Sequence, residues 1–142
     1  MNLKRGILIS LALYFATLVV GILLTILTKI NIASPQNIPT AYWIITIVTT
    51  VILTCLASLW YFNKIKRNIK EGFKLGITFI IVGFILDLLF FFTQENAINI
   101  MKEYYSTPSF YIVLILVIAS AVFIGSKTTH NSKEVRQVKK KE

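Results

Sequence analysis

Residues 71–92 read EGFKLGITFIIVGFILDLLFFF, a stretch that is almost wholly apolar after Lys74 and yet holds a carboxylate, Asp87, deep inside it. A helix of this length, at 1.5 Å per residue, crosses the ~30 Å hydrocarbon layer of a bilayer. Backbone groups find no water in lipid, so a helix is the expected conformation. The stretch therefore predicts a membrane-spanning helix that carries an acid.

Three more blocks of similar length contain no charged residue at all, and the chain as a whole is only 15% charged. A soluble domain has about a quarter of its residues charged. We therefore predict an all-α fold, a bundle of four transmembrane helices formed by residues 1–126. The expected spans are about 6–28, 40–63, 73–94 and 108–126. Residues 127–142 are expected to be a disordered, basic, cytoplasmic tail.

The basic residues predict the orientation of this bundle. Thirteen of the fifteen lie in the two termini and the second loop, and only Lys29 and Lys102 lie in the other two loops. Because basic segments stay cytoplasmic, both termini are expected inside, in a multi-pass protein of the cell membrane. The net charge of +9 then needs no nucleic acid partner. Contact of the C-terminal tail with anionic lipid remains open.

The third loop has a helical pattern of its own. Ala97, Met101 and Tyr104 fall on one helical face, with Ile98 and Tyr105 beside them. This spacing predicts a short amphipathic helix on the outer leaflet, with an irregular loop as the alternative.

Small residues predict which helix faces meet. On the third span Gly72, Gly76 and Gly83 share one sector with Asp87, and the first span offers Gly21 on its small-residue face. Small residues let helices approach closely in lipid. We expect the first three spans to form the core, the second and third to form a tight hairpin, and the fourth span to be peripheral.

The expected partners of Asp87 are hydroxyl groups at a similar depth. Thr46 and Thr50 on the second span and Thr25 on the first complete this candidate polar site, since no Lys, Arg or His lies there within the membrane. A buried carboxylate without a cation favours its neutral form, so Asp87 is expected to be protonated or reached by outside water. Three roles stay open: a structural interhelix bond, ion or substrate coupling, and a contact between subunits.

No pattern for catalysis or cofactor binding accompanies these features. The chain has one cysteine, Cys55, within the second span, and one histidine, His130, in the tail. A disulfide exchange pair, a haem ligand pair and a zinc spacing all need more such residues. We expect no enzyme activity, no cofactor and no metal. The first span also lacks the acid that small four-span multidrug exporters carry there.

The motif EGFKLG at 71–76, followed by LDL at 86–88, resembles a group of small prokaryotic four-span membrane proteins. The resemblance covers roughly residues 40–125. It implies the four-span fold and makes Glu71, Gly72, Gly76 and Asp87 the shared positions, without implying an activity.

These observations favour a non-enzymatic accessory or interaction component of the membrane, which binds lipid and either another membrane protein or further copies of itself. The alternative is a minimal oligomeric transporter or channel for protons, cations or a small solute, with Asp87 on the route.

Overall fold

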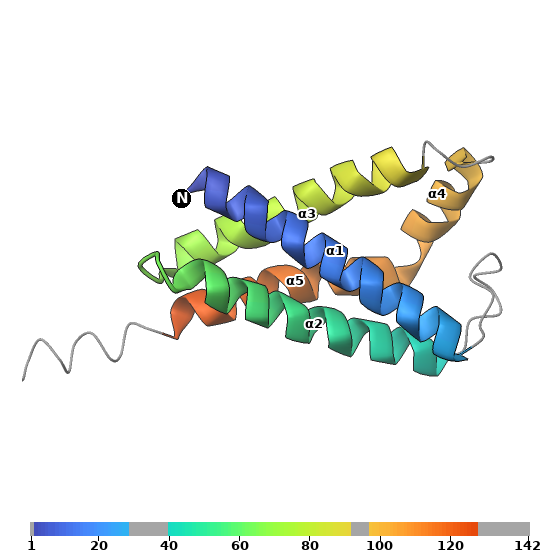
Figure 1. Ribbon diagram of the computed structural model, residues 1–142, viewed down its shortest axis with the longest axis horizontal. Coiled ribbons are helices and arrows are strands. Elements are labelled where there is room, and N and C mark those ends of the chain that lie inside the picture. The colour runs from blue at the N-terminus through green and yellow to red at the C-terminus, as the bar shows by residue number, and fades with distance from the viewer. Residues whose placement is uncertain (1, 29–39, 92–96, 128–142) are drawn as a thin grey trace, which may run out of the picture.

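The computed structural model describes residues 2–28, 40–91 and 97–127. These residues form five helices and no strand, shown in Figure 1: α1 (Leu3–Thr28), α2 (Thr40–Phe62), α3 (Ile69–Phe91), α4 (Ala97–Ser106) and α5 (Pro108–Ser126). The predicted all-α fold with four long helices is confirmed. The short helix predicted in the third loop is also present, as α4.

The four long helices have the length and composition of membrane spans. Their outward surface is apolar: Ile26, Leu89 and Ile115 are 66%, 61% and 67% exposed. A soluble monomer rarely exposes such a continuous apolar surface, whereas acyl chains would cover it. The chain is therefore a multi-pass membrane protein. That both termini are cytoplasmic stays a prediction.

The four long helices form a ring in the order α1, α2, α5, α3. α1 packs against α2 and α3, and α5 packs against the same two helices from the other side. Two expectations were therefore wrong. α5 is central and not peripheral, and it makes the most extensive interface in the described chain, with α3. α2 and α3 run antiparallel but form no tight hairpin, because α5 lies between them.

Glycines explain why α5 packs so closely. A Cβ added to Gly72 would lie 2.6 Å from the carbonyl oxygen of Ala121, and one added to Gly76 would lie 2.9 Å from the Cα of Ile118. Gly125 of α5 makes a similar contact from the other side, since a Cβ added to it would lie 2.8 Å from the carbonyl oxygen of Asn68. Only residues without a side chain permit this approach of two backbones.

The core lies in one half of the bundle, next to the α2–α3 turn. Ile9, Tyr61, Leu75 and Ala121 are at most 1% exposed there. Of the described side chains of the long helices in the other half, only that of Tyr42 is buried. α1 and α3 cross and then diverge toward that end (Figure 1). Asp87 lies in this more loosely packed half.

The structure describes the chain up to Lys127. The C-terminal tail, for which we predict disorder and leave contact with anionic lipid open, lies almost wholly outside the described residues.

Candidate functional site

The carboxylate of Asp87 accepts hydrogen bonds from two tyrosines. The Tyr14 hydroxyl, on α1, donates to Oδ1 over 2.9 Å, and the Tyr105 hydroxyl, on α4, donates to Oδ2 over 3.5 Å. Asp87 itself is half-buried on α3. One acid thus joins three helices that are far apart in the sequence.

Aromatic contacts position the weaker of these donors. The Tyr105 ring lies 4.8 Å from the ring of Phe110 in an edge-on arrangement and 5.6 Å from that of Phe84. Phe84 precedes Asp87 by three residues, so it lies on a neighbouring part of the α3 surface. The ring of Tyr105 is therefore held between α3 and α5, with its hydroxyl directed at the carboxylate.

The three threonines of the predicted site make other hydrogen bonds. Thr46 and Thr50 donate to the carbonyl oxygens of Tyr42 and Thr46, at 2.9 and 2.8 Å. Thr25 donates to the Gly21 carbonyl over 2.8 Å and lies 3.4 Å from the Tyr42 hydroxyl. Such bonds to the preceding turn satisfy a hydroxyl within its own helix. The structure therefore pairs Asp87 with tyrosines, whereas Thr46 and Thr50 bond within α2 and Thr25 also contacts Tyr42 of α2.

The four glycines that were predicted to pack between helices fall into two pairs. Gly72 and Gly76 lie against the α5 backbone, as described above. A Cβ at Gly21 or Gly83 would meet no described atom within 4 Å, so these two positions bring no helices together in the described part of the chain.

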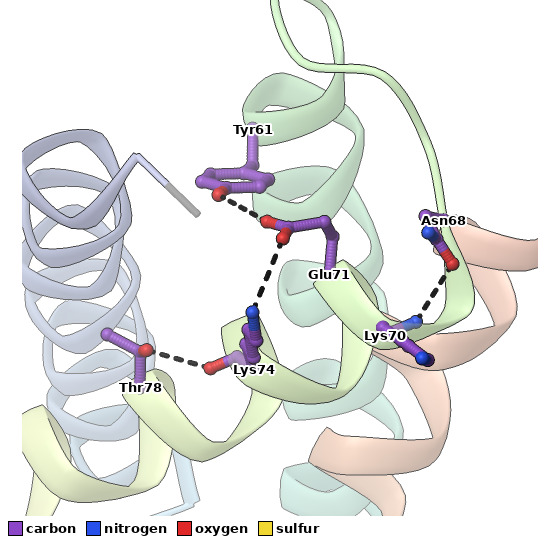
Figure 2. A network of polar contacts seen from close by, with 6 residues as sticks. All are labelled: Tyr61, Asn68, Lys70, Glu71, Lys74 and Thr78. Carbon is purple, nitrogen blue, oxygen red and sulfur yellow. Dashed lines mark hydrogen bonds and ion pairs between the residues drawn. The ribbon is translucent and has the colours of Figure 1, made fainter.

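A second polar cluster lies at the opposite end of the bundle. Tyr61, which is fully buried, donates to Oε2 of Glu71 over 3.5 Å, and Lys74 places its ammonium 3.7 Å from Oε1. Figure 2 shows these groups converging on Glu71, with Thr78 donating to the Lys74 carbonyl beyond them. Glu71 is in the first turn of α3, where a carboxylate also favours the positive end of the helix dipole.

A hydrogen bond from Arg5 joins α1 to this end of the bundle. Arg5 donates from its guanidinium to the Trp60 carbonyl oxygen over 2.6 Å, which satisfies one of the last carbonyls of α2. This cluster therefore holds the beginnings of α1 and α3 and the end of α2 together.

Sequence reasoning missed Tyr14 and Tyr105 as partners of Asp87. The usable signal was that a tyrosine in an apolar span needs a partner for its hydroxyl. Tyr14 is such a residue, and Tyr105 is beside the predicted face of the third-loop helix.

No group of three metal-binding side chains occurs among the described residues. The comparisons with protein-family models, curated proteins and solved structures found no match. The resemblance to small four-span proteins therefore stays a prediction, as does the protonation of Asp87.

Proposed function

We propose that the chain is a non-enzymatic component of the cell membrane that acts through contact with another membrane protein, and that Asp87 serves its structure. The observation that carries this proposal is that both oxygens of Asp87 already accept hydrogen bonds from the protein's own phenols. Each bond links a different helix to α3, in the half of the bundle where packing is sparse. In that half, hydrogen bonds to Asp87 thus hold the helices together in place of apolar packing.

The Tyr105–Asp87 bond holds α4 in place, and the exposed side of α4 is the proposed contact surface. Ile98 on α4 is 80% exposed, and Asn99 beside it is exposed as well. Tyr105, near the end of the same helix, is held by Asp87 and two aromatic rings. A short helix with exposed apolar and polar groups on a fixed base is a suitable contact for a partner at the membrane surface.

The alternative function is a minimal transporter or channel. It is favoured by the place of Asp87 in an apolar span, because intramembrane acids often mark ion routes. A phenol can both donate and accept a proton, so Tyr14 could take part in such a route. A four-helix bundle of this size has little room for an alternating-access cavity, so this function would require self-association.

Two measurements on the full chain separate these functions. A photo-reactive amino acid at Ile98 on α4 reports protein contact in intact membranes, and the same residue at Ile115, 67% exposed on α5, is the matched control. Ion flux and a scan of small solutes are measured in proteoliposomes for the wild type and Asp87→Asn.

We expect a discrete protein adduct at Ile98 and not at Ile115, with no flux in either protein. A flux that disappears in Asp87→Asn, while the variant stays folded, would establish transport and refute the accessory role. The absence of any protein adduct at Ile98 would refute the role of α4.

A further inference from the structure

A cavity of about 400 Å³ lies at the α2–α3 turn, away from Asp87. It is lined by Asn2 at the start of α1, by the turn residues Ile65, Lys66, Arg67 and Asn68, and by Glu71. Its volume is within the range of about 300–1,000 Å³ that is usual for small-molecule sites.

The charge of this cavity suits an anion. Lys66 and Arg67 supply two cations, and a guanidinium can hold a phosphate through two parallel hydrogen bonds. The carboxylate of Glu71 is offset by the Lys74 ammonium at 3.7 Å and accepts from Tyr61 at 3.5 Å. The negative charge of Glu71 is therefore offset by Lys74, and the two cations Lys66 and Arg67 give the cavity lining a net positive charge.

The fold also contains an apolar groove of about 370 Å³. It runs between α1 and α3, from Leu3 to Leu11 on one side and from Thr78 to Leu86 on the other, and Thr78 is its one polar lining residue. The Thr78 hydroxyl already donates to the Lys74 carbonyl. The groove opens on the outward surface, where Leu3 and Ile81 are 56% and 53% exposed.

The linings of the cavity and of the groove are connected through neighbouring residues of the chain. Asn2 lines the cavity and Leu3 lines the groove. On α3, Glu71 and Thr78 are two turns apart, about 10 Å at the helical rise. A ligand that fills both needs a phosphate at one end and an acyl chain at the other. We propose that an anionic phospholipid binds here, with its headgroup on Lys66 and Arg67 and one chain between α1 and α3.

This site is independent of the function proposed for Asp87 and α4. It differs from the tail as a lipid contact, because it combines a cationic cavity with a groove for the chain. Basic pockets between spans are known places for anionic headgroups.

The test measures lipid bound to the full-length protein in neutral detergent by native mass spectrometry. The probes are phosphatidylglycerol and phosphatidylcholine with the same acyl chains, together with soluble glycerol phosphate as a competitor. Lys66→Gln with Arg67→Gln removes the headgroup contacts. Lys64→Gln with Lys70→Gln removes the same charge from residues next to the cavity that do not line it.

A second pair of variants tests the groove. Leu11→Trp fills it, whereas Leu8→Trp adds the same side chain to the exposed surface of α1, at a residue that does not line the groove. Helix content measured by circular dichroism shows that each variant is folded.

We expect one phosphatidylglycerol per chain, bound in preference to phosphatidylcholine. The Lys66/Arg67 variant should weaken this binding by about 10–30-fold, the effect of two basic residues near a lipid surface. The Lys64/Lys70 and Leu8 controls should change it less than about threefold, and Leu11→Trp should weaken it.

Equal losses in the two charge variants would show attraction by general surface charge and would overturn the site. Equal binding of the two lipids would overturn the headgroup contact. Displacement by glycerol phosphate would mean a site for a soluble anion, and full binding by Leu11→Trp would refute the groove.

Discussion

At the scale of single residues, Tyr14 and Tyr105 explain how an acid is kept in an apolar span. Their hydroxyls donate to the two carboxylate oxygens of Asp87 at 2.9 and 3.5 Å. In the described part of the spans no cation is paired with this acid. Two phenol hydroxyls are therefore the hydrogen-bond partners of this acid, and each bond also ties one helix to another.

Tyr14→Phe should lower the free energy of unfolding in lipid by about 0.5–1.5 kcal/mol, because it removes a bond between helices and keeps the ring. Tyr105→Phe should cost less, since its bond is longer. Tyr111→Phe, at an exposed tyrosine of α5, is the control and should have no effect. Reversible unfolding in mixed micelles measures all three; a loss as large at Tyr111 would contradict the assignment.

The sequence revealed the acid but not its partners, and the reason is geometric. Depth was counted along helices taken as parallel, which pointed to threonines on the first and second spans. α1 crosses α3, as Figure 1 shows. A Cβ added to Gly6 of α1 would lie 3.8 Å from Thr78 of α3, and Tyr14 meets Asp87 about two turns further along both helices. α1 is therefore displaced along α3 relative to the count, which puts Tyr14 at the level of Asp87. Tyr105 comes from a helix outside the four spans, so no count along a span could have found it.

At the scale of helices, length and charge predicted the spans well, because a charged residue is costly in hydrocarbon whatever surrounds it. The central place of α5 could not be predicted in the same way. The residues by which it packs, such as Ala121 and Gly125, are small and apolar, and they resemble residues that face lipid. Polarity marks a buried face in a membrane protein, but close packing of small residues leaves a weaker signal.

Gly76→Ala should destabilise the bundle by about 1–3 kcal/mol, because its methyl group would lie 2.9 Å from the Cα of Ile118 on α5. Gly83→Ala on the same helix meets open space, so it should be neutral or stabilise the helix by up to about 1 kcal/mol. Unfolding of both variants in the same lipid provides the comparison. Equal effects would contradict the close α3–α5 contact.

At the scale of the whole molecule, the two ends differ in how they are held. The end at the α2–α3 turn is packed and contains the Glu71 cluster, whereas the α4 end contains the hydrogen bonds of Asp87 with Tyr14 and Tyr105. The basic residues predict that the packed end faces the cytoplasm.

In a chain with Cys55→Ala, a cysteine at Asn99 on α4 should react with a membrane-impermeant maleimide added to intact cells. A cysteine at Lys66 in the α2–α3 turn should react only after the membrane is permeabilised, because the positive-inside rule places that turn in the cytoplasm. Both residues are exposed, so accessibility within the protein does not limit either reaction. The reverse labelling pattern would contradict the predicted orientation.

The central claim is that Asp87 is a structural fastening between helices, and a double-mutant cycle of Tyr14→Phe and Asp87→Leu in lipid tests it most directly. The cycle isolates the energy of the pair from the separate effect of removing an acid from the membrane. We predict a favourable coupling of about 0.5–1.5 kcal/mol between the two residues. Strictly additive effects would mean that the Tyr14–Asp87 bond does not hold α1 to α3.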